Sequence, residues 1–225
     1  MIQFVQQDQP VEDDFVEQRA GSNSAGGLDV IDHVAMGLTL EQVDTWILFT
    51  RAVLALTASD GVDVAQPFGV MRGVGVANDT RSVRMLLNVS VTPSAEPSRR
   101  SEAARNSAVI NSIALACTDI FATVERLRRN GVSFVPISGN YYDDLTAREV
   151  LDKATVERMR AQGIVFAGSG TGSYYQAYTK PFEGRFHFQI VQRTAYDAYG
   201  AINEPLRAAS LEQLRQFEEW LQPWL

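Results

Sequence analysis

The chain has 225 residues, enough to bury the core of one domain made of two modules, or of two small domains. Its 20 Lys and Arg residues stand against 27 Asp and Glu residues, and the net charge of −7 disfavours nucleic acid or an anionic membrane as a partner. A single cysteine, Cys117, excludes an internal disulfide and a cysteine-rich zinc cluster. With no signal peptide and no run of about eighteen apolar residues, we expect a cytoplasmic protein.

The first part of the chain predicts a tail followed by one folded module. Residues 1–27 mix glutamine, acids, glycine and serine without periodicity, which is typical of a tail or a linker. Apolar patterning starts at Leu28. It predicts a β-α-β-β-β unit, module one, over residues 28–90, with a strand, a helix and three strand-like runs at 28–37, 39–54, 56–65, 69–78 and 83–91.

The same order of elements then repeats. Residues 91–107 contain two prolines and no apolar pattern, so we expect a loop. Module two is predicted over residues 108–197, with strands at 108–118, 132–138, 163–170, 172–182 and 185–197, a helix at 119–131 and a helical insertion at 141–163. Residues 28–210 would form one α+β domain, and residues 211–225 an added C-terminal helix. Two such modules can curve their sheets into an open barrel around a shared cavity.

A few polar side chains interrupt otherwise apolar strands. They are His33, Asn88, Ser112, Gln176, His187 and Gln189, and they include both histidines of the chain. Alternation in the strand around residues 186–193 puts His187 and Gln189 on the face opposite Phe188. If Ser112 were histidine and Gln189 were glutamate, they would complete with His33 the two-histidine, one-carboxylate triad that binds non-haem Fe(II).

Several stretches, in order, carry a family resemblance: IDHVA, VRMLLNVS, INSIALACTDIFATVERLRRNGVSFVPI, NYYDDLTAR, QAYTKPFEGRFHFQIVQR and YGAINEPLRAA. They resemble the C-terminal half of the 4-hydroxyphenylpyruvate dioxygenases. They are more similar still to the dioxygenase-like domain at the C-terminus of bacterial two-domain 3-dehydroshikimate dehydratases. The resemblance covers about residues 28–208 and implies the vicinal oxygen chelate fold, also called glyoxalase or dioxygenase-like.

The resemblance also implies where a metal would lie. The three ligand positions of the family fall on His33, Ser112 and Gln189, and only His33 keeps a ligand of the expected type. His187 replaces a pocket-lining aromatic residue and is a possible substitute ligand. Asn88 and Gln176 match positions that contact substrate, and Phe188 is a further pocket candidate. We therefore expect no cofactor and assign no catalytic residue; the alternative is a site for Fe(II) or another divalent metal.

Three functions remain open at this point. The first is a metal-free, dioxygenase-like domain of a 3-dehydroshikimate dehydratase, in which a separate N-terminal barrel, absent from this sequence, forms protocatechuate. This domain would then have a structural, oligomerising or modulatory role, with the barrel or a second copy of the chain as its partner. The second is an active Fe(II)-dependent 2-oxo-acid dioxygenase. The third is a small-molecule binding module that uses the same cavity.

Overall fold

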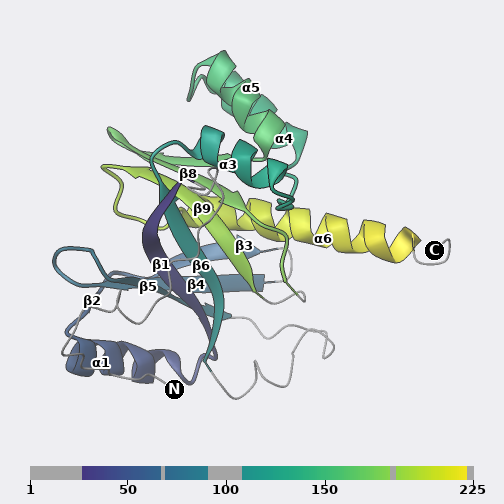
Figure 1. Cartoon of the computed structure of the whole chain (residues 1–225). Coiled ribbons are helices and arrows are strands. Elements are labelled where there is room, and N and C mark those ends of the chain that lie inside the picture. Colours follow the sequence, from purple (N-terminus) through teal and green to yellow (C-terminus); the bar gives the residue numbers. More distant parts are fainter. Residues whose placement is uncertain (1–26, 67–68, 91–107, 183–185, 222–225) are drawn as a thin grey trace, which may run out of the picture.

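The computed structural model describes residues 27–66, 69–90, 108–182 and 186–221. The strands among these residues form one curled, mixed sheet in the order β2-β4-β5-β1-β6-β9-β8-β7, with β3 also paired to β4. Helices pack on both halves of the sheet (Figure 1). The expected α+β architecture of two repeated modules that form an open barrel is confirmed, and the barrel is a half-barrel made by one curled sheet.

Module one forms the first half of the sheet. Its elements are β1 (Leu28–Leu38), α1 (Val43–Leu54), β2 (Thr57–Ala58), β3 (Val62–Gln66), β4 (Gly69–Ala77) and β5 (Arg84–Ser90). β1 runs parallel to β5, and β4 runs antiparallel to β5. The apolar stripe of α1, including Trp46 and Ile47, packs on a buried cluster that contains Val76 and Leu87. Burial of this stripe holds α1 against the sheet.

Module two repeats this arrangement with an insertion. Its elements are β6 (Val109–Cys117), α3 (Ile120–Arg129), α4 (Gly139–Ala147), α5 (Lys153–Gln162), β7 (Val165–Ser169), β8 (Gly172–Tyr178) and β9 (His187–Thr194). β6 runs parallel to β9, as β1 does to β5. The Asp119 side chain caps α3 by accepting a hydrogen bond from the backbone N–H of Ala122. The side chain of Asp152 caps α5 in the same way.

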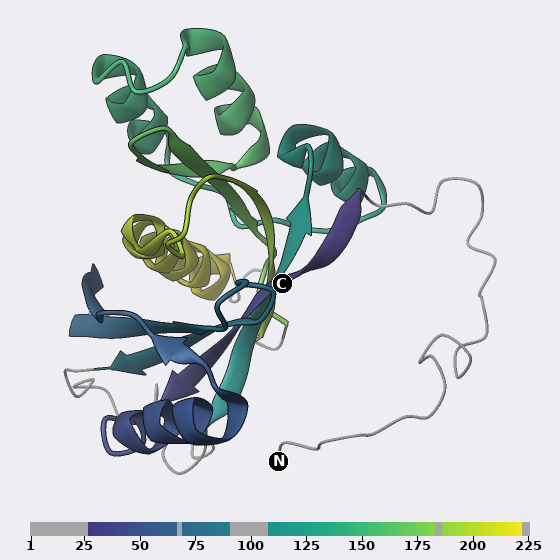
Figure 2. The same cartoon turned by 90° about the vertical axis from the view of Figure 1, so that its left-hand side faces the viewer.

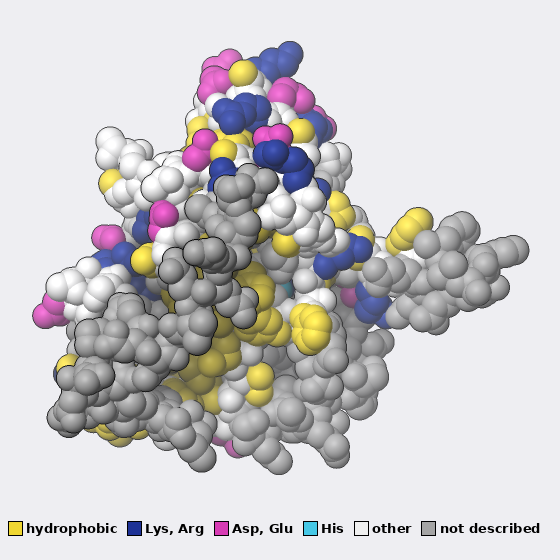
Figure 3. Space-filling model, in the orientation of Figure 1, with side chains coloured by type: hydrophobic (Ala, Val, Ile, Leu, Met, Phe, Trp, Pro, Cys, Tyr) yellow, Lys and Arg dark blue, Asp and Glu magenta, His cyan; other side chains and the backbone are white. Residues whose placement is uncertain are grey.

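The two modules meet at an antiparallel seam between β1 and β6, where Ala35 lies opposite Ser112. The seam strands also expose apolar side chains, because Val30, Ile31 and Ile110 are all about half exposed or more. Figure 3 shows hydrophobic side chains gathered over the middle of one face, where Figure 1 places β1 and β6. Exposed apolar clusters of this kind are typical of interaction surfaces.

The last helix, α6 (Glu204–Leu221), lies between the two halves of the curled sheet (Figure 2). Leu206, Leu211 and Leu214 pack against a buried cluster that contains Tyr178. The helix begins seven residues before the predicted start at residue 211, directly after a short 3₁₀ turn, η3 (Ala201–Asn203). Pro205 is compatible with this start because the first turn of a helix does not use its N–H groups.

Two further details differ from the sequence-based expectation. Residues 132–138 form no strand; only Phe134 makes an isolated bridge, to Thr179, and Pro136 has no N–H to continue a ladder. The run 56–65 is two strands, β2 and β3, because the pairing with β4 is interrupted at residues 59–61, between Ala58 opposite Val76 and Val62 opposite Gly73. The predicted tail, except Gly27, and the predicted loop at 91–107 lie outside the described residues. None of the described helices is long and apolar enough to span a membrane.

Candidate functional site

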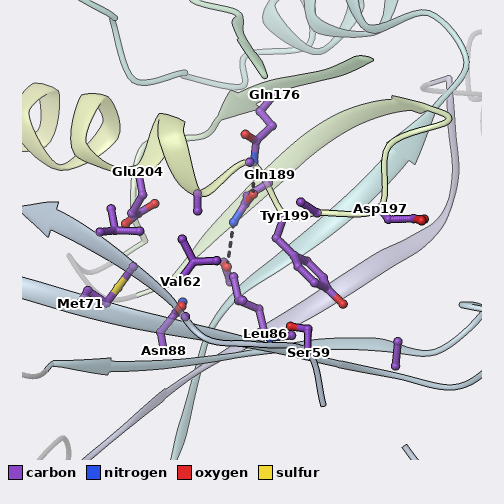
Figure 4. Close-up of a pocket in the computed structure, with 18 of the residues that line it drawn as sticks. Ser59, Val62, Met71, Leu86, Asn88, Gln176, Gln189, Asp197, Tyr199 and Glu204 are labelled. Atoms are coloured by element: carbon purple, nitrogen blue, oxygen red, sulfur yellow. Dashed lines mark hydrogen bonds between the residues drawn. The ribbon is translucent and has the colours of Figure 1, made fainter. Parts of the chain in front are cut away.

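A cavity of about 810 Å³ lies inside the curl of the sheet (Figure 4). Its walls differ in chemistry. Module one supplies an apolar wall made of Val62, Val64, Met71 and Leu86. Module two supplies a polar wall made of Ser112, Gln176, His187 and Gln189. The cavity therefore brings together four of the polar strand residues singled out in the sequence, and Asn88 lines it from β5.

The polar wall is tied together by a chain of neutral hydrogen bonds. Asn203 Nδ2 donates to Gln176 Oε1 at 2.8 Å, and Gln176 Nε2 donates to Gln189 Oε1 at 3.2 Å. Gln189 Nε2 then donates to Ser112 Oγ at 3.1 Å. The four side chains come from η3, β8, β9 and β6, and all are buried. Because the amide oxygens of Gln176 and Gln189 each accept a bond, burial of these two groups is compensated.

His33 lies apart from this chain. Its side chain is buried, but it is not among the residues that line the cavity. Tyr199 does line the cavity, and its ring packs edge-on against the His33 ring with centroids 5.1 Å apart. Of the three positions that the resemblance implied for a metal, Ser112 and Gln189 are therefore hydrogen-bonded to each other, and the His33 ring lies outside the cavity lining, in contact with Tyr199.

His33 belongs instead to a buried ion-pair cluster. Its Nδ1 lies 2.7 Å from Asp32 Oδ1, and Arg193 binds the same carboxylate with Nε at 2.9 Å and a terminal nitrogen at 2.8 Å. Arg84 approaches Asp32 to 3.7 Å. Burial alone would raise the pKa of Asp32, but the hydrogen bonds from His33 and Arg193 outweigh it and hold this pKa well below its ordinary value.

Sequence reasoning missed Asp32 and Arg193. The signal was present: a carboxylate next to a histidine within the apolar run VIDHVA needs a buried cation, and Arg193 interrupts the end of a similar strand.

The residues between β9 and α6 pack against the polar wall and position the start of α6. Gly200 has φ +65°, a left-handed conformation that favours glycine, and a Cβ atom there would overlap Gln176 Oε1. A Cβ on Gly75 would overlap the Tyr199 ring. Tyr199 and Gly200 are thus fitted against both modules, which explains the YGAIN segment of the sequence in terms of packing.

His187 and Phe188 show the effect of strand alternation. His187 lines the cavity and is 8% exposed, and burial together with the charge of Arg207 lowers its pKa to about 3. The imidazole is therefore neutral at pH 7. Phe188 is 41% exposed and does not line the cavity. The prediction of Phe188 as a pocket residue is wrong because successive side chains of β9 point to opposite faces.

Charged groups gather where α6 and the loops meet the cavity. The lining contains four carboxylates, on Asp60, Asp79, Asp197 and Glu204, and two guanidinium groups. Arg207 pairs with Glu204, with one nitrogen–oxygen contact of 2.9 Å, and Arg81 lies 3.5 Å from Asp197. Neither Asp60 nor Asp79 forms an ion pair with any described residue. The sequence pattern does not identify this set, because its members come from separate loops and from α6.

The donors in the cavity do not match those that Fe(II) prefers. Ser112 and Gln189 are neutral, both are engaged in the hydrogen-bond chain, and no carboxylate replaces Gln189 in it. Across the part of the chain that the structure describes, no three His, Cys, Asp or Glu side chains come close enough together to hold a metal ion. His187, the possible substitute ligand, lines the cavity on the same wall as Gln189, and its Nε2 has no hydrogen-bond partner among the described residues.

Comparison with known proteins agrees with this fold. Residues 30–155 match the model of the Glyoxalase/Bleomycin resistance protein/Dioxygenase superfamily. The chain belongs to this superfamily. A 4-hydroxymandelate synthase variant from Streptomyces coelicolor superposes over 84% of the chain and 55% of its own, with a TM-score of 0.71 and 20% identity, which shows the shared fold.

The chain is also similar to parts of longer proteins. The chain is 36% identical to a 3-dehydroshikimate dehydratase of Pseudomonas aeruginosa over 90% of its length, and 26% identical to the 4-hydroxyphenylpyruvate dioxygenase of the same organism, also over 90%. A fusion protein of a xylose isomerase-like TIM barrel and a 4-hydroxyphenylpyruvate dioxygenase superposes with a TM-score of 0.72, at 33% identity over 84% of the chain. The chain spans 32% of the dehydratase, 57% of the dioxygenase and 30% of the fusion protein.

Proposed function

We propose that this chain acts as the dioxygenase-like part of a 3-dehydroshikimate dehydratase, and that it supports the dehydratase without iron or oxygen chemistry of its own. The reaction from 3-dehydroshikimate to protocatechuate would belong to a barrel domain. Support comes from the 36% identity to a dehydratase of which the chain spans about a third, and from the similarity to a barrel–dioxygenase fusion.

One observation supports the proposal that this chain has no iron chemistry. Two of the three positions where the resemblance implies metal ligands hold Ser112 and Gln189, which hydrogen-bond to each other at 3.1 Å. A serine hydroxyl and a neutral amide bring no negative charge to compensate Fe(II). The buried carboxylate near His33 belongs to Asp32, and Arg193 already neutralises it.

A metal titration tests this part of the proposal. Anaerobic calorimetry with Fe(II) should show no tight binding to the wild-type chain, whereas the Ser112→His, Gln189→Glu double variant should gain divalent-metal affinity. Adding His33→Ala to the double variant should remove the gain, which serves as the control. Stoichiometric iron on the wild-type chain, with oxygen uptake on 4-hydroxyphenylpyruvate, would instead establish an active dioxygenase.

The supporting role is proposed to act through contact between domains. The apolar side chains on the seam strands, including Val30 and Ile110, offer a surface for the dehydratase barrel or for a second copy of the chain. Adding this chain to a dehydratase barrel that lacks its own dioxygenase-like domain should raise the Tm or the kcat of the barrel. The Val30→Glu, Ile110→Glu variant should not do so. If the wild-type chain changes neither quantity, the supporting role is wrong.

A further inference from the structure

The cavity has the size and the chemistry of a ligand site. Its volume of about 810 Å³ falls in the range of about 300 to 1,000 Å³ that small-molecule sites occupy. One wall is apolar, with Val62, Met71 and Leu86, and the opposite wall is polar. A molecule that fits both walls has one apolar face and one face with hydrogen-bonding groups.

The polar wall has hydrogen-bonding capacity left over. Ser112 Oγ accepts a bond from Gln189, so the Ser112 hydrogen remains available as a donor. His187 is more than nine-tenths buried, and its Nε2 has no hydrogen-bond partner in the part of the chain that the structure describes. Asn88 Oδ1 is also without a partner there, and Figure 4 shows Asn88 pointing from β5 toward the same space as Gln189. Unsatisfied buried polar groups are costly, and hydroxyl groups of a ligand, which both donate and accept, can satisfy them.

The charges of the lining disfavour an anion. Both lining guanidinium groups are already paired, Arg207 with Glu204 and Arg81 with Asp197. Asp60 and Asp79 add two further negative charges. A carboxylate that enters the cavity loses hydration and meets no unpaired cation among the described lining residues, so its transfer from water costs free energy that nothing there offsets.

We propose that this cavity binds an uncharged, hydroxyl-bearing small molecule with one apolar face, and that it rejects carboxylates. The inference rests on the proposed function in one respect, namely that no metal is bound. A bound divalent metal would neutralise a carboxylate ligand and remove the preference for uncharged molecules. The proposal therefore predicts a preference for uncharged ligands, whereas a site that binds 2-oxo acids prefers carboxylates.

A matched pair of ligands tests the proposal. Shikimate and its methyl ester share the same ring and hydroxyl groups but differ in charge. In calorimetry with EDTA, the ester should bind the wild-type chain at least about tenfold more tightly than the acid, in line with the cost of desolvating an unpaired charge. Equal affinity, tighter binding of the acid, or no binding of the ester would overturn the proposal.

A charge variant sharpens the test. Glu204→Gln keeps the size of the side chain and leaves Arg207 without its carboxylate, so this variant should bind the acid about tenfold more tightly than wild type while its affinity for the ester stays unchanged. Glu212→Gln is the matched control, because Glu212 pairs with Arg215 at the same spacing on α6 but does not line the cavity. Unchanged acid binding by a folded Glu204→Gln variant contradicts the proposal. If that variant does not fold, the wild-type comparison decides by itself.

Repeating these titrations with Fe(II) in place of EDTA separates this inference from the proposed function. Acid binding that requires added Fe(II) would show that the chain holds a metal, and the proposed function would then be wrong. Acid binding in EDTA that is as tight as ester binding would overturn only the ligand class inferred here.

Discussion

Asp32 is the carboxylate at the centre of the buried ion-pair cluster. Its carboxylate is 5% exposed and is shared by His33 and Arg193, with Arg84 nearby. A buried charge needs such partners, since the free-energy cost of leaving it unpaired in a protein interior is several kcal/mol. The cluster joins β1 of module one to β9 of module two, so it stabilises the contact between the modules.

Replacing Asp32 by Asn should lower the free energy of unfolding by about 3 kcal/mol at pH 7, because Arg193 would keep a buried charge without a carboxylate. Urea unfolding measures this. Asp63→Asn is the control, since the Asp63–Arg72 pair is also short, at 2.6 Å, but half exposed; it should have a much smaller effect. Equal losses for the two variants would mean that the buried cluster has no special role.

The Asp32 pair also has a defined pH dependence. Because the folded-state pKa of Asp32 lies below its ordinary value of 3.8, its stabilisation is complete above that pH and is lost as the pH falls further. The difference in unfolding free energy between wild type and Asp32→Asn should therefore shrink by up to about 1.4 kcal/mol per pH unit below 3.8. A difference that stays constant from pH 5 to about pH 2 would contradict this assignment.

His187 should contribute a second pH dependence with a different range. Burial lowers its pKa from 6.5 to about 3, so only the unfolded chain takes up this proton between these values. Stability should fall as the pH drops below 6.5, by up to about 1.4 kcal/mol per unit from this group. The variant His187→Gln should lack this contribution, and urea midpoints between pH 7.5 and 4.5 would show it. Parallel curves for the two proteins would disprove the prediction.

The turn into α6 is the element that closes the polar wall. Gly200 lies against Gln176, and Asn203, three residues later, donates to the same Gln176 oxygen. The start of the helix is therefore tied to the hydrogen-bond chain. A displacement of this turn would break the bond from Asn203 and open the cavity on the side of α6.

Gly200→Ala tests this coupling. Alanine should cost about 1–2 kcal/mol for the left-handed backbone and more for its overlap with Gln176, and it should reduce the hydrogen-exchange protection of α6. Gly170→Ala is the matched control, because Gly170 has φ +59° but nothing within 4 Å of a Cβ atom. If the two variants lose the same stability and α6 keeps its protection, the turn does not anchor the helix.

In the whole molecule, the two modules share too many contacts to be independent units. The β1–β6 seam makes the sheet continuous, the Asp32–Arg193 pair bridges the modules, and α6 lies between the two halves. A continuous sheet with a shared interior favours unfolding in one step.

Native-state hydrogen exchange should therefore give the same free energy of opening for the slowest amides of β4 and β5 as for those of β8 and β9. Both values should equal the free energy of unfolding from urea, measured on the same sample. A separate, lower opening energy for one half would show that the modules unfold independently.

The amino-acid pattern alone predicted the duplicated modules and the inward direction of His187 and Gln189. Those features depend on local periodicity, which is read from neighbouring residues along one strand or helix. The same pattern failed at residues 132–138, because an apolar run reads as a strand even where a proline, here Pro136, has no N–H to continue the ladder.

Contacts between distant segments were decided only by the tertiary structure. Asp32 meets Arg193 across 161 residues, and Ser112 meets Gln189 across 77. The position of Tyr199, whose ring packs edge-on against His33, depends on where the loop before α6 packs. Residue type and spacing show which groups need a partner, but the partner is fixed by the curl of the sheet, which brings β1, β6 and β9 side by side.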